Sequence, residues 1–309
     1  MMLNDFQSLA VGLLLAGIGG EVFLRGVVGL AQCVRVSASI IAATIAAFAT
    51  SSPEFFIALS SATAGEPEIS LGDALGSNVM NVALILGLAI MIAAIPTTWQ
   101  NIRREFFGAL LAPILVGALA VDGKISRLDG CLLVVAFFSW LALIVIEARK
   151  QREESAPSPR GETGSVKVTM ACLVGLACLI AGGNLVVEGA KELTKKFGIS
   201  EFAIGATMVA AGTSMPELAT TLVAQLRGKR DISLSTILGS NIFNGLWIIG
   251  IAAMICPIDV SGWQIKITLI TGLLTVLMLV PSRRGFIGRS HGIGLLIVYV
   301  AYVTFVLRK

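Results

Sequence analysis

The stretch of sequence that decides the fold occurs twice. Residues 44–81 read TIAAFATSSPEFFIALSSATAGEPEISLGDALGSNVMN, and residues 207–244 read TMVAAGTSMPELATTLVAQLRGKRDISLSTILGSNIFN. Adding 163 to a number in the first copy gives its partner in the second without a gap. Each copy places one glutamate directly after a proline, Glu54 after Pro53 and Glu217 after Pro216. This duplication predicts a chain made of two related halves.

The composition is that of a membrane protein. Of the 309 residues, 56% are hydrophobic and 14% are charged, and the mean hydropathy is +0.89. Soluble domains carry about 25% charged residues. The net charge of +4 is small and scattered, so it does not indicate nucleic-acid binding. The five cysteines form no CxxC pair, and we expect them to be buried free thiols.

Apolar segments of membrane-crossing length predict an all-α membrane protein. A helix needs about 20 apolar residues to cross a bilayer, and these segments are continuous, whereas transmembrane β-strands alternate. The acidic start of the chain favours a retained first span over a cleaved signal peptide. The ten predicted spans are 7–30, 37–64, 69–95, 105–121, 128–148, 168–190, 200–226, 232–256, 264–281 and 290–307.

The spans divide into two five-helix repeats, residues 1–150 and 168–309, joined by a polar segment at 151–167 that we expect to be a flexible linker. Five is an odd number, so the second repeat enters the membrane from the opposite side, and the repeats are inverted. Such repeats are common in secondary transporters, whose sites lie near the midplane. With both termini outside, 15 Lys and Arg fall on the inner side and 8 on the outer side, as the positive-inside rule requires.

Two acidic residues, Glu54 and Glu217, are predicted to lie well inside spans. The other acidic residues in or beside the later spans are expected near span ends, where water or headgroups reach them: Asp73, Glu147, Glu188 and Glu201. A charge at the bilayer centre costs about 2.5–3.5 kcal/mol on insertion scales. No Lys or Arg lies at mid-depth in the four spans around the glutamates, so a cation from solution is the expected partner.

The neighbours of the glutamates offer only oxygen atoms. Each proline removes a helical N–H, which frees a backbone carbonyl one turn earlier, and small polar residues share helical faces with the glutamates and with each other. Oxygen donors without His or Cys favour Ca²⁺ or Na⁺ over Zn²⁺ or Cu⁺. In the alternative reading, the hydroxyls bond to their own helices and the asparagines join helices. The polar residues are Thr50, Ser51, Ser77, Asn81, Thr213, Ser214, Ser240 and Asn244.

At these residues the chain resembles the sodium/calcium exchanger family of the calcium/cation antiporters. That family carries a G-T-S-x-P-E motif in each repeat, followed about 22 residues later by G-S-N-x-x-N or a close variant. Residues 212–217 fit the first motif fully, whereas residues 49–54 have Ala49 in place of its glycine. The similarity covers essentially the whole chain, including the ten-helix count and the short linker.

The resemblance implies that Glu54 and Glu217 bridge the bound cations. It adds the hydroxyls of the Thr and Ser residues named above, and backbone oxygens of Ala47, Thr50, Ala210 and Thr213. Spans one and six would slide across the other eight, over the glycine-rich segments at 19–20 and 182–183. Some family members have Asp where this chain has Asn244, so the expected site holds two carboxylates, and the choice between Na⁺ and H⁺ as driving ion stays open.

The sequence therefore predicts a secondary antiporter that exchanges Ca²⁺ for Na⁺ by alternating access. The alternatives are a H⁺/Ca²⁺ or K⁺-linked antiporter and, in another class, a cation channel, because carboxylate rings also select cations. No HExxH or GxSxG motif supports an enzyme, and no cofactor is expected. We expect a multi-pass protein of a prokaryotic inner membrane; the oligomeric state is left open.

Overall fold

The computed structural model describes residues 2–34, 36–154, 165–194, 205–260 and 262–307. Helices dominate it, and two pairs of two-residue strands join their ends. Each of the ten predicted spans contains a described helical segment. The prediction of an all-helical membrane fold built from two repeats is confirmed.

In the first repeat, the second and third spans are interrupted helices. Both contain a stretch of wider π-helix, η1 and η2. The elements are α1 (Met2–Val34), α2 (Ala38–Ile41), η1 (Ala42–Ala46), α3 (Ala47–Thr50), α4 (Ser52–Ala64), α5 (Pro67–Val79), η2 (Met80–Leu86), α6 (Gly87–Ile92), α7 (Trp99–Leu119) and α8 (Arg127–Glu154).

In its described residues, the second repeat follows the same order of elements. Its second π-helical stretch starts at Phe243, 163 residues after the start of η2. The elements are α9 (Ser165–Thr194), η3 (Gly205–Val209), α11 (Ala210–Thr213), α12 (Met215–Leu226), α13 (Arg230–Ile242), η4 (Phe243–Ile248), α14 (Ile249–Ile255), α15 (Trp263–Leu277) and α16 (Arg289–Val306).

Short strands tie the repeats together. β1 (Ile95–Pro96) pairs antiparallel with β4 (Phe286–Ile287), and β2 (Lys124–Ile125) pairs antiparallel with β3 (Ile258–Asp259). Each pair takes one strand from each repeat. The strands follow helix ends, so they fix where the helices of one repeat end relative to those of the other.

Length and composition alone mark several helices as membrane spans. Within the described residues, four continuous helices are long and apolar enough to cross a bilayer: Pro67–Ile92, Arg127–Lys150, Arg230–Ile255 and Arg289–Val306. A fifth is added if Ala38–Thr50 and Ser52–Ala64, which meet at a bend of 43°, count as one span. The α5–η2–α6 and α13–η4–α14 spans are largely buried, 78% and 83% of their apolar windows, so they form the centre of the bundle.

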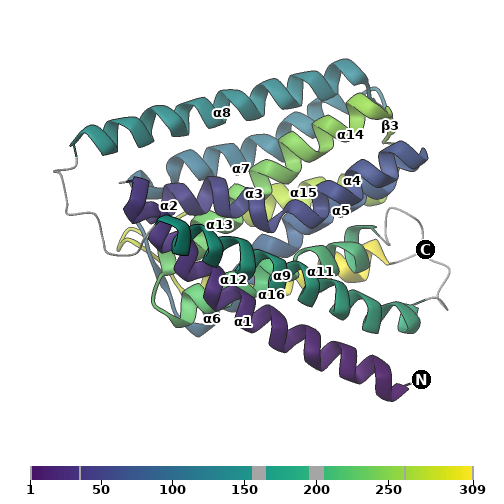
Figure 1. Cartoon of the computed structure of the whole chain (residues 1–309). Helices are drawn as coiled ribbons and strands as arrows, with labels where there is room; N and C mark the ends of the chain where they lie inside the picture. Colours follow the sequence, from purple (N-terminus) through teal and green to yellow (C-terminus); the bar gives the residue numbers. More distant parts are fainter. Residues whose placement is uncertain (1, 35, 155–164, 195–204, 261, 308–309) are drawn as a thin grey trace.

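α1 and α9 form a separate pair at one edge of the bundle, and α8 runs along the opposite edge (Figure 1). The largest contact of α1 is with α9. A Cβ added at Gly26 would lie 2.7 Å from the backbone nitrogen of Cys172, and one at Gly175 would lie 2.5 Å from that of Phe23. Glycine is therefore what allows these two helices to touch. The predicted sliding segment at 182–183 lies outside the residues whose side chains are described.

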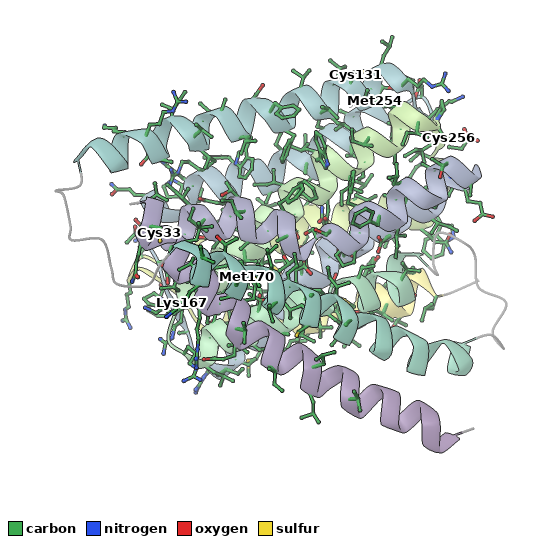
Figure 2. The ribbon with its side chains drawn as sticks, in the orientation of Figure 1. Cys33, Cys131, Lys167, Met170, Met254 and Cys256 are labelled. Atoms are coloured by element: carbon green, nitrogen blue, oxygen red, sulfur yellow. The ribbon has the colours of Figure 1, made fainter. Side chains whose placement is uncertain are left out.

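The cysteines and the segment at 151–167 were both subjects of sequence predictions. The five cysteines are free, as expected, but none is fully buried: Cys33 and Cys131 are exposed on the protein surface (Figure 2), and the other three are partly exposed. The linker predicted at 151–167 stays a prediction; α8 continues to Glu154 and α9 begins at Ser165. Its remaining residues, 155–164, lie outside the described part of the chain.

Candidate functional site

A break in each repeat places the two glutamates. α3 ends at Thr50 and α4 begins at Ser52, with Ser51 between them at φ −85° and ψ 13°. The second repeat has the same break at Ser214, with φ −78° and ψ 8°. A proline in the first turn of the following helix favours this break. Proline has no N–H, so it cannot donate the hydrogen bond to the preceding helix that would make the two helices continuous. Each glutamate consequently lies in the first turn of a new helix.

Both glutamates are fully buried, and each accepts a hydrogen bond from the other repeat. Ser51 Oγ donates to Glu217 Oε1 over 2.8 Å, and Ser214 Oγ donates to Glu54 Oε1 over 3.3 Å. These two bonds are related by the offset of 163. The two broken helices therefore cross where the serine of one meets the glutamate of the other.

The next helix of each repeat completes the surroundings, but not symmetrically. Ser240 donates to Glu217 Oε1 over 3.2 Å. Its counterpart Ser77 lies 3.5 Å from the hydroxyl of Thr213. The structure thus brings the predicted serines to the site, and the two ends of the site differ.

Three of four buried asparagines near the glutamates join the repeats by hydrogen bonds. Asn78 Nδ2 donates to the carbonyl of Asn241 over 3.1 Å, and Asn241 Nδ2 donates to the carbonyl of Asn78 over 2.9 Å. Asn81 Nδ2 donates to Asn241 Oδ1 over 3.1 Å. Asn244 is fully buried, and neither its oxygen nor its nitrogen has a hydrogen-bond partner. Sequence reasoning included Asn81 and Asn244 but left out the reciprocal pair, although those two positions also match at the offset of 163.

The predicted backbone ligands lie in the same breaks. Thr50 Oγ1 donates to the carbonyl of Ala47, and Thr213 Oγ1 donates to that of Ala210, both over 3.3 Å. These bonds to the same helix are what the alternative reading of the hydroxyls expected. All twelve predicted site residues therefore lie along the two breaks and the two helices that follow them.

Several buried oxygens of this region have no hydrogen-bond partner. A buried polar group without a partner costs free energy, so these oxygens are candidates to bind a cation. Among the described side chains, no Lys or Arg pairs with either glutamate, and no three His, Cys, Asp or Glu residues form a metal-binding group by themselves. Hydroxyl, amide and carbonyl oxygens must therefore complete any cation site. Among the described residues of this region, the unpartnered carboxylate and amide oxygens are Glu54 Oε2, Asp73 Oδ2, Asn78 Oδ1, Asn81 Oδ1, Glu217 Oε2 and Asn244 Oδ1.

Asp73 was expected near a span end, within reach of water, and this prediction was wrong. Its side chain is fully buried, and its Oδ1 accepts a hydrogen bond of 3.0 Å from Thr213 Oγ1. The sequence contained the signal: Asp73, Ser77 and Asn81 are spaced four apart, which places them on one face of a helix.

The π-helical stretches were also missed by sequence reasoning. Such stretches are rare and frequently mark functional sites. η2 and η4 contain Asn81 and Asn244, and η1 and η3 lead directly into the helical turns of Ala47 and Ala210. The extra residue in each stretch changes the direction in which the following side chains point. No residue type in the sequence indicates such a stretch.

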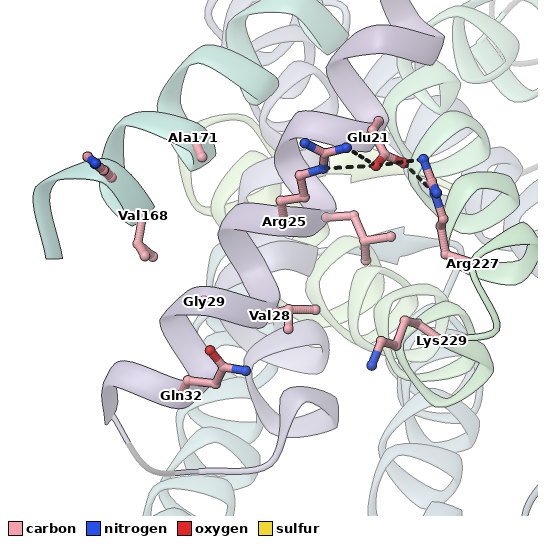
Figure 3. Close-up of a pocket in the computed structure, with 11 residues that line it drawn as sticks. Glu21, Arg25, Val28, Gly29, Gln32, Val168, Ala171, Arg227 and Lys229 are labelled. Atoms are coloured by element: carbon pink, nitrogen blue, oxygen red, sulfur yellow. Dashed lines mark hydrogen bonds and ion pairs between the residues drawn. The ribbon is translucent and has the colours of Figure 1, made fainter. Parts of the chain in front are cut away.

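A second group of charges lies at an open pocket of about 480 Å³ between α1, the start of α9 and the turn after α12 (Figure 3). Glu21 contacts Arg25 over 2.9 Å, as the i,i+4 spacing predicts. It also contacts Arg227 over 2.9 Å, a partner from the other repeat that the sequence did not indicate. Lys167 and Lys229 line the same pocket.

Comparisons with known proteins agree with this architecture. The profile of the family described as "Sodium/calcium exchanger protein" matches residues 5–146 and 167–308. The chain is 32% identical over 306 residues to the putative antiporter CaxA of Alkalimonas amylolytica, covering 94% of this chain and 95% of that protein. It is 34% identical over 271 residues to the inner membrane protein YrbG of Escherichia coli, covering 84% and 82%.

A solved structure is similar over the same extent. The structure of the sodium/calcium exchanger from Methanococcus jannaschii superposes with a TM-score of 0.80 and 29% sequence identity. The match covers 98% of this chain and 99% of that one. The likeness thus extends over both repeats.

Proposed function

Because this chain belongs to the sodium/calcium exchanger family, whose members are membrane transporters, we propose that it exchanges Ca²⁺ for Na⁺ at the site between its repeats. The observation that supports this most directly is the pair of buried carboxylates, Glu54 and Glu217. Each is held by a serine of the other repeat, and each has one oxygen without a partner.

Charge and donor type select the cargo. Two carboxylates neutralise one Ca²⁺ or two Na⁺, and the surrounding donors are all oxygens, which these hard cations prefer. Since both ions need the same carboxylates, Ca²⁺ and Na⁺ exclude each other from the site. Mutual exclusion at one site that opens alternately to the two sides is what couples the two fluxes.

We assign the remaining predicted residues to the same site. Glu54 and Glu217 bind the divalent cation, and the hydroxyls and amides replace its water shell together with two backbone carbonyls. Asn244, which has no partner in the protein, is free to turn its oxygen to the ion. The residues in these supporting roles are Thr50, Ser51, Ser77, Asn81, Thr213, Ser214, Ser240 and Asn244, with the carbonyls of Ala47 and Ala210.

The pair α1 and α9 is the element that we expect to move. Its two helices bury their glycines against each other, and its contact with the central helices is smooth: Gly20 faces the backbone of Ala219, 3.2 Å from an added Cβ. A rigid pair sliding over this surface would expose the glutamates first to one side and then to the other, as in other inverted-repeat transporters.

The test is radioactive calcium uptake into liposomes that contain the purified protein and are loaded with Na⁺. We expect uptake to require the Na⁺ gradient and to fall at least 100-fold in Glu54→Gln. Glu105→Gln is a matched control, because Glu105 is also buried, 2% exposed, but lies in α7 next to Arg104. Uptake that is independent of the gradient, or that survives Glu54→Gln, would sink the proposal. Uptake driven only by a pH gradient would instead identify H⁺ as the driving ion.

We further propose that the protein resides in the inner membrane of a prokaryotic cell with both termini outside. The lysine and arginine count supports this orientation, and the relative YrbG is described as an inner membrane protein. Cysteine labelling of intact cells tests it: a cysteine introduced at Lys229, on the predicted inner side, should not react with a membrane-impermeant reagent. One introduced at Lys266 should.

A further inference from the structure

Asp73 is a third buried carboxylate beside the two glutamates. It lies in α5, one turn before Ser77, and is 0% exposed. Thr213 Oγ1 donates to its Oδ1 over 3.0 Å, and the hydroxyl of Ser77 lies 3.5 Å from that of Thr213. Its Oδ2 is buried and has no hydrogen-bond partner among the described residues. Its negative charge lies close enough to Glu54 and Glu217 to repel theirs.

The second repeat has no carboxylate at the equivalent place. Adding 163 to Asp73 gives Thr236, a fully buried threonine in α13 whose hydroxyl has no partner. At the other polar position of this helix face, one turn after the serine, both repeats carry a neutral asparagine, Asn81 and Asn244. Asp73 therefore makes the charges that the two repeats contribute to this buried centre unequal.

We infer that Asp73 is a further cation-binding residue, which holds a monovalent cation together with the hydroxyls of Thr213 and Ser77. This inference rests on the proposed function and deepens it, because it assigns a second cation position beside the pair of glutamates. The position has one negative charge, two hydroxyls and the carbonyl oxygens of Val209 and Ala210, which lie 3.2 and 3.3 Å from Thr213 Oγ1.

Charge distinguishes the two positions. Two carboxylates match a divalent ion, whereas one carboxylate among neutral oxygens leaves a divalent ion half compensated in a medium where unpaired charge is costly. A monovalent ion such as Na⁺ is compensated fully.

The third carboxylate changes the net charge that one transport cycle moves across the membrane. With three acids, three Na⁺ neutralise the region, so exchange for one Ca²⁺ moves one net positive charge per cycle. With Asp73 neutralised, two Na⁺ suffice and exchange carries no net charge. Membrane voltage should therefore drive transport in the natural protein and not in a variant without the third acid.

The experiment measures Na⁺-driven calcium uptake into liposomes at membrane potentials set with K⁺ and valinomycin. The variants are Asp73→Asn, which keeps an acceptor for Thr213; Asp73→Thr, which copies the second repeat; and Asp73→Asn with Asn244→Asp, which moves the acid to another buried position of the site. Glu105→Gln serves as the buried-acid control. In parallel, bound Ca²⁺ is displaced by increasing Na⁺ on protein in detergent, and the Hill slope of this displacement curve is measured.

We expect the single variants to keep Ca²⁺ binding within about threefold while they lose voltage dependence, with the Na⁺ displacement slope falling by about one. The double variant should regain both. Unchanged voltage dependence and slope in Asp73→Asn and Asp73→Thr would overturn the inference and make Asp73 a purely structural partner of Thr213. If the natural protein shows no Na⁺-driven uptake, the proposed function fails, and the displacement slope alone decides the role of Asp73. Should one single variant not fold, the other and the double variant decide.

Discussion

Two regions of the molecule hold acidic side chains in opposite ways. Glu21, at the open pocket, is 24% exposed and contacts two guanidinium groups over 2.9 Å each, one from its own helix and one from the other repeat. Glu54, Glu217 and Asp73, at the centre, are fully buried and form no described ion pair. The partly exposed Glu21, which water can solvate, has two cationic partners. The three buried acids, which water does not solvate, have only hydroxyl partners.

This difference separates a structural charge from a functional one. In water, an ion pair contributes little, because both charges are already well solvated. In the bundle, an unpaired carboxylate is costly, and an internal Lys or Arg would remove that cost permanently. A transporter must bind and release a cation at these carboxylates. A Lys or Arg side chain paired with them would occupy the cation site permanently, so the protein cannot supply the counter-ion itself.

The largest expected effect comes from neutralising both glutamates. A ligand that binds only the folded state stabilises it by RT ln(1 + [L]/Kd), about 2.7 kcal/mol at 100 times Kd. We expect Ca²⁺ to raise the melting temperature of the natural protein in detergent, and Glu54→Gln with Glu217→Gln to abolish that rise. The double variant should also melt higher than the natural protein without Ca²⁺, because two buried charges are gone.

Glu21→Gln is the control for that measurement, and the calcium-induced shift should persist in it. A calcium shift that survives in the double glutamine variant would place the cation elsewhere and remove the contrast between the two regions.

The next effect concerns the close packing of the helices around the centre. An added Cβ at Gly239 would clash with the carbonyl oxygen of Ala43, and one at Gly76 would clash with the backbone of Ala206, the residue 163 positions after Ala43. We expect Gly239→Ala to destabilise the protein by about 1–3 kcal/mol through overpacking, seen as a lower melting temperature. Gly117→Ala, whose nearest new contact is at 3.8 Å, is the matched control. If Gly239→Ala and Gly117→Ala had equal melting temperatures, the helices around the centre would accommodate the extra methyl group without loss of stability.

The repeat made much of this predictable from sequence. A constant offset of 163 related the two Pro-Glu breaks, and the cross-repeat bonds of Ser51 and Ser214 follow the same relation. Polar residues repeated at fixed spacing in apolar helices have to meet, because lipid offers them no partner. The sequence therefore predicted which polar residues lie near one another, although it could not state distances or the difference between Ser77 and Ser240.

The depth of a residue was harder to predict. Asp73 follows the start of α5 at Pro67 by only six residues, and a straight helix would leave it near water. The structure buries it because α5 packs against η3 and α11 of the other repeat. Depth depends on how the interrupted helices cross, and the π-helical stretches that set this crossing have no residue signature. The second partner of Glu21, Arg227, was missed for the same reason, since it is 206 residues away.

A smaller effect is expected from the serines that hold the glutamates. A hydrogen bond to a charged group contributes about 1.5–3 kcal/mol, so Ser51→Ala, which removes the 2.8 Å bond to Glu217, should weaken Ca²⁺ binding at least tenfold. Ser214→Ala removes a longer bond of 3.3 Å to Glu54 and should weaken it less. Calcium titrations followed by melting temperature compare the two. A reversed order would mean that bond length in this structure does not rank the two ends of the site.

The smallest effect is expected at the pocket. Glu21→Gln removes contacts to arginines whose side chains are 72% and 59% exposed, and pairs of this kind contribute about 0.2–1 kcal/mol. We therefore expect a slight drop in melting temperature that disappears at high salt, because salt screens exposed charges, and no change in calcium affinity. The contact between Glu21 and Arg227 joins α1 to the turn after α12, so it crosses the surface over which α1 is proposed to slide. If Glu21→Gln changed the uptake rate while stability and calcium affinity stayed constant, the pair would act as a latch between transport states, and the contrast between a structural and a functional charge would have to be redrawn.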